Sequence, residues 1–392
     1  MDYSWPSIWS VPYALRSDDP SVQTGSLVKE LIDRRREFGI SRIGSITRLD
    51  RVRIPVIQVT RPLALSNAVT QGKGFNYLQA TISALMEALE LWAGERPCPA
   101  SVNRTAAELG AEIGDTYESS VLAGTQASWR AMPISWSQGW DLFRSEATWV
   151  PLALVDTVYA VPSPHPELFP RSTTGLGAGR SLYQALCKAA LEILERDAIA
   201  NAHRLNRLFD KCQVDPASVK GGLSAKLIQQ IQSKGLLVGI WLVPAPHDLP
   251  VYCCHVMENK GFNELAPLPG AGYACHFTHD EALASALMEA CQGRLTAIAG
   301  AREDITRSLY PTKHDRVQLA EWRDFLAAPT NVIRIPELAQ ANFVDSDRSI
   351  QRLMHALRKA GATRAIVVPL YAELPSGIHV IRMVAPGMRH TP

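Results

Sequence analysis

Residues 79–93 read QATISALMEALELWA, an apolar stretch in which the polar side chains recur at the spacing of one helix face. Gln79, Ser83, Glu87 and Glu90 stand at positions i, i+4, i+8 and i+11, which an α-helix places within roughly 80° of its circumference. The stretch contains no Lys or Arg that could neutralise its glutamates. An apolar helix with acidic groups along one narrow edge should be buried, with that edge facing a positive partner.

The same polar pattern occurs twice more along the chain. The two later sets are Gln184, Lys188, Glu192 and Glu195, and then Glu281, Ser285, Glu289 and Gln292. An alanine follows the first polar position of every set, and glycines precede every segment. Close helix packing alone would account for the alanines, but it does not explain a matched polar edge. The economical interpretation is a strand–helix unit of roughly 100 residues that is repeated about three times.

Composition excludes several classes of protein. The chain has 392 residues, 46% hydrophobic and 20% charged, which suits one large or two ordinary domains. A net charge of +2 gives no electrostatic reason to expect binding to nucleic acid or to an anionic membrane. No apolar run is long enough to span a bilayer. The seven cysteines are scattered without a C-x-x-C pair, which favours a cytoplasmic, reduced protein.

The remaining segments predict a mixture of helices and strands, and therefore an α+β fold. Charged or amphipathic patterns predict helices at 27–39, 106–117, 224–235, 317–327 and 350–361. Runs rich in β-branched residues predict strands at 41–49, 51–62, 236–245, 251–259, 363–371 and 378–386, and a hairpin over 139–159. We expect an N-terminal extension (1–40), a core (41–310), and C-terminal helices and strands (311–392) that complete the same domain.

The clustered carboxylates point to a particular chemistry. Two carboxylates about 4 Å apart repel by about 4 kcal/mol at an effective dielectric near 20, so a buried cluster must take up protons, cations or metal. Paired Glu-x-x-Glu oxygens suit Mg²⁺ or Ca²⁺ rather than Zn²⁺. The glycine-rich stretches 71–74 and 174–181 could bring backbone N–H groups and Lys73 to a phosphate. The sequence therefore predicts a magnesium–nucleotide site that lacks a P-loop motif.

Paired carboxylates also occur in two other kinds of site. A di-iron bundle would need Glu-x-x-His pairs, which the striped segments do not contain. Glycoside hydrolysis stays formally open, although three repeated sets exceed what two catalytic acids require.

The three striped segments resemble the YcaO family. The matching stretches are QGKGFNYLQATISALMEALE (71–90), TTGLGAGRSLYQALCKAALEILERDA (173–198) and EALASALMEACQGRLTAIAGARED (281–304). The resemblance spans about residues 45–310 and extends weakly to the final strand. RIPVIQVTRP (53–62), QGKG and GARED resemble the YcaO proteins that work beside a TfuA-like partner.

The resemblance implies a YcaO-like fold around a central site for ATP and Mg²⁺. The implied ligands of Mg²⁺ are Glu87, Glu90, Glu192 and Glu195. The implied nucleotide-binding residues are Lys73, Ser83, Gln184, Lys188, Arg196, Glu289, Gln292, Arg294 and Arg302. No catalytic residue is assigned. Structural alternatives stay open for the cations: a helix-dipole role for Arg196, an i,i+4 pair with Glu192 for Lys188, and ion pairs with Glu303 or Asp304 for Arg294 and Arg302.

The function implied by the resemblance is ATP-dependent O-phosphorylation of a backbone amide in a ribosomally made peptide. Thioamide formation with a TfuA-like partner is the expected reaction, and sulfur would arrive with the partner. Azoline formation by a cyclodehydratase is the alternative, disfavoured because the sequence does not end in a proline-alternating tail. A non-catalytic nucleotide-binding scaffold is a third hypothesis, since Leu91 and Gln184 replace an Arg and a Glu that are common in the family. A homodimer is left open.

Overall fold

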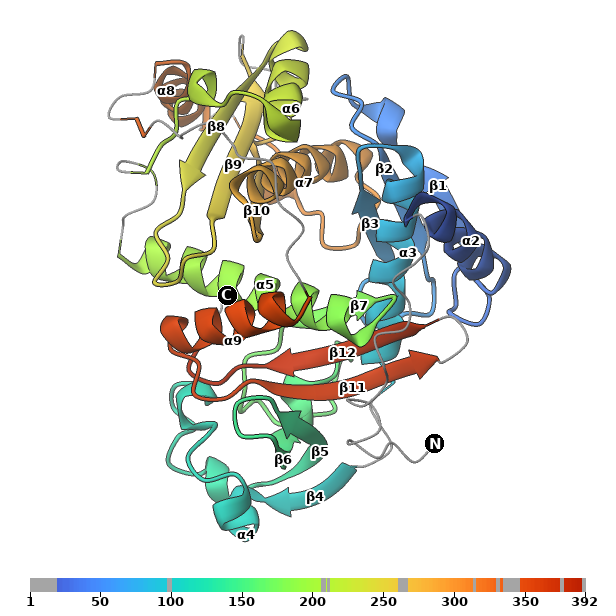
Figure 1. The fold of residues 1–392 in the computed structure, drawn as a ribbon, viewed down its shortest axis with the longest axis vertical. Coiled ribbons are helices and arrows are strands. Elements are labelled where there is room, and N and C mark those ends of the chain that lie inside the picture. The colour runs from blue at the N-terminus through green and yellow to red at the C-terminus, as the bar shows by residue number, and fades with distance from the viewer. Residues whose placement is uncertain are drawn as a thin grey trace.

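The computed structural model describes residues 20–96, 101–205, 209, 212–259, 267–312, 315–328, 332–333, 346–373 and 377–389. The first 19 residues of the predicted N-terminal extension, and Cys98, lie outside these ranges. Among the described residues, no helix has both the length and the apolar character needed to cross a membrane. The predicted α+β character is confirmed (Figure 1).

Antiparallel strands form three sheets. The first contains β1 (Arg42–Ser45), β2 (Val56–Thr60) and β3 (Val69–Lys73). The second has the order β4 (Ser101–Thr105), β5 (Pro133–Asp141), β11 (Ile366–Glu373), β12 (Ile378–Val384) and β7 (Leu176–Gly179), and β6 (Glu146–Pro151) also pairs with β5. The third contains β10 (Gly270–Cys275), β9 (Val251–Glu258) and β8 (Leu236–Leu242). Strands from the C-terminal region thus share a sheet with β7 of the predicted core.

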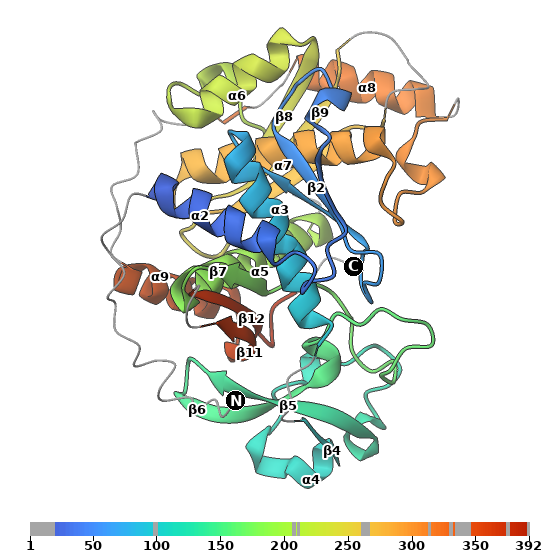
Figure 2. The same ribbon diagram turned by 90° about the vertical axis from the view of Figure 1, so that its right-hand side faces the viewer.

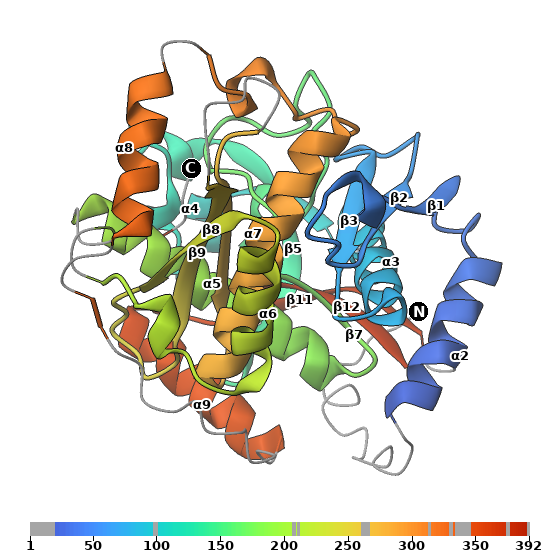
Figure 3. The same cartoon turned by 90° about the horizontal axis from the view of Figure 1, so that it is seen from above.

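Helices cover these sheets. They are α2 (Pro20–Asp33), α3 (Tyr77–Gly94), α4 (Ala106–Leu109), α5 (Leu182–Arg204), α6 (Gly222–Ser233), α7 (His279–Ala299), α8 (Arg316–Ala327) and α9 (Ser346–Ala360). Figure 2 shows α2 lying across α3, where Leu27 and Leu31 join the buried core around Leu85 and Leu89. Figure 3 shows the third sheet between α8 on one side and α6 and α7 on the other.

The three striped helices occupy equivalent places in the fold. Each follows a strand at the edge of a different sheet: β3 precedes α3, β7 precedes α5 and β10 precedes α7. Each helix packs on the strand before it and also touches the edge strand of another unit, in a closed cycle. Thus α3 contacts β7, α5 contacts β10 and α7 contacts β3. The repeated unit predicted from the sequence is therefore present, and the three units surround a common centre.

Glycine permits the close approach of strand to helix in every unit. A Cβ atom at Gly72 would lie 2.0 Å from the backbone nitrogen of Ala84, and one at Gly177 would lie 2.2 Å from the carbonyl oxygen of Ala185. The third unit uses Gly272, whose Cβ would lie 2.2 Å from the Ala286 carbonyl. The constant offset between the first and third striped segments would place Ala274 at the position of Gly72. The shift by two residues keeps the glycine on the same strand face and moves its contact one helical turn along.

Two segments differ most from their predicted secondary structure, and the helix predicted over 27–39 begins earlier and ends at Asp33. The strand expected over 41–49 is limited to β1, because residues 47–49 form a 3₁₀ turn in which Thr47 bonds back to the chain at Val56. The helix expected over 106–117 is the single turn α4 followed by 3₁₀ turns. Gly110 ends α4 at a φ of +46°, a conformation that a continuing helix does not allow.

Candidate functional site

The first polar position of each stripe belongs to the cap of its helix. The side chains of Asn76, Ser181 and Thr278 accept the backbone N–H of the residue three positions later. In return, the side-chain oxygen of Gln184 accepts the N–H of Arg180 at 2.9 Å. A polar cap followed three residues later by Gln or Glu is a helix-start signal that the sequence analysis missed. Gln184, predicted to line the nucleotide site, thus stands exposed at the beginning of α5.

The acidic edges of α3 and α5 face each other. The Lys188 ammonium of α5 forms an ion pair with Glu90 of α3, and Glu90 also accepts the backbone N–H of Ala178 at 2.7 Å. Lys188 therefore pairs with Glu90 of another repeated unit, and not with Glu192 of its own helix as in the i,i+4 alternative. The Glu90 side chain is only 7% exposed, whereas that of Lys188 is 46% exposed. The cation can be reached from solvent, while its carboxylate partner is buried.

The edge of α7 faces the same centre through strand β3. Lys73 Nζ lies 2.9 Å from Glu289 Oε2, and Gln292 donates from Nε2 to the carbonyl of Gln71 at 2.8 Å. Glu289 in turn lies close enough to Glu195 of α5 to raise the pKa of that carboxyl. The structure therefore brings the polar edges of α3, α5 and α7 together.

The carboxylates at this centre are poorly compensated. Burial raises the pKa of Glu195 to about 8, and the nearby charge of Glu289 adds to the shift. Burial also raises the pKa of Glu87 to about 7, although Lys188 opposes the change. The pKa of Glu192 is raised for the same reason, despite the charge of Arg196. A centre that holds carboxylates in which the charged form is disfavoured should bind additional positive charge.

A magnesium ion fits the kind of ligand that the centre offers. All the converging acidic donors are glutamate oxygens, which suit a hard cation. Within the described part of the chain, however, no three His, Cys, Asp or Glu side chains are close enough to hold a metal ion. Lys73 and Lys188 instead bind Glu289 and Glu90. Magnesium ligation by Glu87, Glu90, Glu192 and Glu195 thus stays a prediction.

Three other predicted residues have different surroundings. Arg294 is buried and pairs with Asp50 at 3.0 Å and Glu258 at 2.8 Å, so it links α7 to neighbouring elements. Arg302 forms the ion pair with Asp304 that the sequence analysis left open as an alternative to phosphate binding. Its charge also opposes the rise in the pKa of Glu87. Their predicted phosphate contacts are untested. Ser83 is partly buried on α3, one turn before Glu87.

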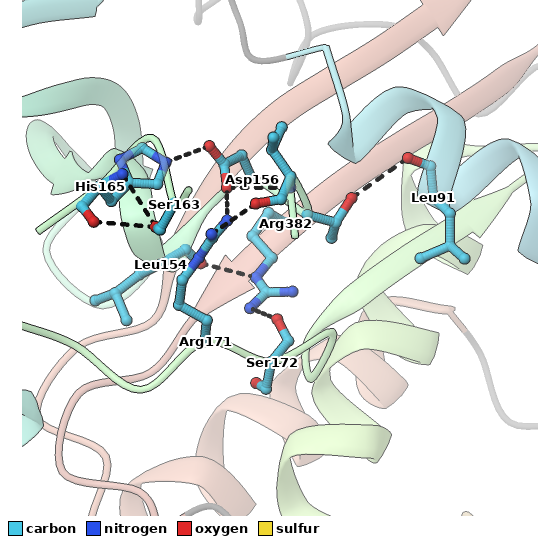
Figure 4. Close-up of polar contacts among 10 residues, drawn as sticks. Leu91, Leu154, Asp156, Ser163, His165, Arg171, Ser172 and Arg382 are labelled. Carbon is cyan, nitrogen blue, oxygen red and sulfur yellow. Dashed lines mark hydrogen bonds and ion pairs between the residues drawn. The ribbon is translucent and has the colours of Figure 1, made fainter. Parts of the chain in front are cut away.

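Sequence reasoning did not single out the polar cluster at the C-terminal end of α3 (Figure 4). Asp156 accepts bonds from His165 at 2.5 Å and from Arg171. The next residue, Thr157, donates to the carbonyl of Leu91 at 3.4 Å, which attaches this loop to α3. Arg382 of β12 lies beside the cluster, with its guanidinium between two segments of the loop. These residues belong to no repeated pattern, so only the fold reveals them.

Comparisons with known proteins agree with this arrangement. A family model described as YcaO cyclodehydratase, ATP- and Mg²⁺-binding, matches residues 71–389. The chain is 31% identical to an uncharacterized protein of Mycobacterium tuberculosis over 89% of this chain and 78% of that protein. It is 27% identical to an uncharacterized protein in the tfuA 3′ region of Rhizobium leguminosarum bv. trifolii, covering 90% and 84%. The structure of YcaO from Methanopyrus kandleri bound with AMPPCP and Mg²⁺ is similar in fold, with a TM-score of 0.70, 22% identity, and coverage of 93% and 91%.

Proposed function

This chain belongs to the YcaO family of ATP- and Mg²⁺-binding, peptide-modifying enzymes, and on that premise we propose that it activates a backbone amide of a ribosomally made peptide by O-phosphorylation. The observation that supports the proposal best is the meeting of three helix edges. Glu87 and Glu90, Glu192 and Glu195, and Glu289 come from separate units, yet they influence one another's charge. Such a centre suits a divalent cation and a triphosphate.

The residues of the chain would bind and orient the reactants. Glu87, Glu90, Glu192 and Glu195 would hold Mg²⁺, while Lys73, Lys188 and Arg196 would face phosphate oxygens. Bound ATP would supply the phosphoryl group that converts the amide oxygen into a leaving group. The work of the protein is then to position the two reactants and to neutralise charge, without a covalent step on a side chain. We assign no general base.

The nucleophile determines the product, and we propose that it is a sulfur donor delivered by a TfuA-like partner in the cytoplasm. This proposal is supported by the relative in the tfuA 3′ region and by the QGKG and GARED stretches. A cyclodehydratase that forms azolines from a neighbouring Cys, Ser or Thr side chain is the second candidate. The family description as a cyclodehydratase favours it.

The test combines the purified chain, a candidate precursor peptide and the TfuA-like protein in every pairing, with ATP consumption and peptide mass as readouts. A mass increase that corresponds to exchange of oxygen for sulfur supports thioamide formation. A loss of one water supports azoline formation. No ATP turnover in any pairing, together with nucleotide binding, would instead support a scaffold, for which Leu91 and Gln184 are the sequence arguments. No nucleotide binding at all would refute the proposed site.

A further inference from the structure

Arg382 differs from the other buried arginines in its surroundings. Arg61, Arg294 and Arg364 each pair with at least one carboxylate. Arg382 is 4% exposed, and no ion pair joins it to a carboxylate of the described residues. A buried guanidinium that bonds only neutral carbonyls is costly, even though the charges of Glu192 and Asp156 act on it from a distance, so its burial calls for a specific role. The position of Arg382 on β12, which packs against both α3 and α5, places it beside the proposed nucleotide site.

Its guanidinium joins the two ends of one loop. Nε donates to the carbonyl of Leu154 at 3.0 Å, and Nη2 donates to the carbonyl of Ser172 at 2.8 Å. Figure 4 shows the guanidinium lying between these two segments, while Nη1 has no hydrogen-bond partner among the described residues. A planar guanidinium can bond both carbonyls at fixed angles, which an ammonium cannot do. Arg382 therefore closes the base of the loop that leads into β7.

The end of this loop reaches a glutamate that we assign to Mg²⁺. Met383, the neighbour of Arg382, donates its backbone N–H to the carbonyl of Gly175 at 2.8 Å. The N–H of Gly175 then donates to Glu192 Oε2 at 3.2 Å. Gly175 has a φ of +86°, and a Cβ there would lie 2.3 Å from the Met383 carbonyl oxygen, so the turn admits only glycine. Residues 382–383 thus hold the turn 172–175 from two sides.

We propose that Arg382 is a positioning residue of the nucleotide site, which fixes the turn 172–175 so that the Gly175 amide holds Glu192 in its ligating orientation. The inference rests on the proposed function in one respect, the assignment of Glu192 to Mg²⁺. Partners behind a metal ligand set its orientation, and their loss typically lowers metal affinity 10- to 100-fold. The rest of the loop has its own attachments, through Asp156 with Arg171 and Thr157 with Leu91. Loss of the guanidinium should therefore loosen mainly the turn.

The test compares Arg382→Lys with Arg364→Lys. Arg364 is a matched control because it is equally buried and precedes β11 of the same sheet, but it forms an ion pair with Asp141 at 3.7 Å and donates to Thr148 at 3.1 Å, and no hydrogen bond between described residues joins it to the turn. The first readout is amide hydrogen exchange in the ligand-free protein over residues 172–176. The second is the affinity for AMPPCP with Mg²⁺. Arg382→Gln, which keeps a donor without charge, serves as the second variant if the lysine variant fails to fold.

Arg382→Lys should speed exchange in the turn and weaken AMPPCP binding by about 10-fold or more, whereas Arg364→Lys should do neither. Wild-type exchange over 172–176 in the Arg382 variants would overturn the inference. Faster exchange with unchanged AMPPCP affinity would overturn it too, since the turn would then have no influence on the site. A wild-type chain that fails to bind AMPPCP and Mg²⁺ refutes the proposed function itself, which is a different result from equal binding by wild type and variant.

Discussion

Replacing Gly72 with alanine should disturb both the stability and the site of this protein. The added Cβ would lie 2.0 Å from the Ala84 nitrogen and 2.6 Å from the Ala80 carbonyl oxygen, although real Cβ contacts essentially never fall below 3.0 Å. These are backbone atoms that cannot rotate away. Helix α3 must therefore retreat from β3 by about 1 Å or distort, and overpacking of this kind typically costs about 1–3 kcal/mol.

The displacement also reaches the site, because Ala84 lies one turn before Glu87 on the same helix. A misplacement of about 1 Å in a catalytic arrangement can cost about 10²-fold in rate. We therefore expect Gly72→Ala to lower the free energy of unfolding in urea by about 1–3 kcal/mol, and to weaken binding of Mg²⁺ and an ATP analogue more than the stability loss alone would do.

The same substitution in open space provides the control. Gly25 lies within α2, and a Cβ there would meet nothing within 4 Å. Gly25→Ala should therefore stabilise the protein by about 0.5–1 kcal/mol, because alanine restricts the unfolded chain and favours helix. Urea denaturation should show that the free energy of unfolding falls in Gly72→Ala and rises in Gly25→Ala. Equal stability of Gly72→Ala and wild type would refute the close packing of α3 on β3, and unchanged nucleotide affinity would refute its coupling to the site.

Three further outcomes are expected. Glu87→Gln and Glu192→Gln should each abolish binding of Mg²⁺ with ATP and leave the circular dichroism spectrum unchanged; wild-type affinity in both would contradict the assigned ligands. Lys188→Met should lower the free energy of unfolding by more than the roughly 1 kcal/mol typical of an exposed pair, because it leaves the buried Glu90 carboxylate without its cation. Added Mg²⁺ should raise the melting temperature of this variant more than that of wild type, and an equal rise would count against a metal at Glu90. Burial lowers the pKa of His255 from 6.5 to about 4, so the neutral imidazole contributes stability above pH 6.5, and roughly 3 kcal/mol of it is lost as the pH falls towards 4. In His255→Phe, the free energy of unfolding should therefore fall less between pH 6.5 and 4 than in wild type. An equal fall in both proteins would exclude His255 as its cause.

Local patterns made the striped helices and their glycine-bearing strands predictable. The spacing of Glu87 and Glu90 identifies a buried edge, because helix geometry fixes which positions share a face. The placement of α5 and α7 as further copies follows from the same spacing. Local turns were harder to predict from the sequence, because the 3₁₀ turn at Thr47 depends on a side chain that bonds to Val56 of the neighbouring strand.

Partners across the fold were not predictable from spacing. Lys188 has an acidic residue one turn away in its own helix, yet it binds Glu90 in another unit, which only the packing of α3 on β7 brings near. The side chain of Gln184 is of a type that can bind a ligand, but its oxygen accepts a backbone N–H at the start of its own helix. Arg382 looked like one residue in a hydrophobic strand, because the carbonyls that it bonds lie far away in the sequence. Such contacts are set by tertiary structure, which single-sequence patterns do not encode.

The closed cycle in which α3 meets β7, α5 meets β10 and α7 meets β3 makes the centre a joint property of all three units. Removing any one of them would open the ring and leave the remaining carboxylates facing water, so a truncated fragment should lose its ligand completely rather than by degrees. Conversely, a ligand gripped from three directions ties together segments that are distant along the chain. Its arrival should protect the whole ring from proteolysis, including places that the ligand never touches.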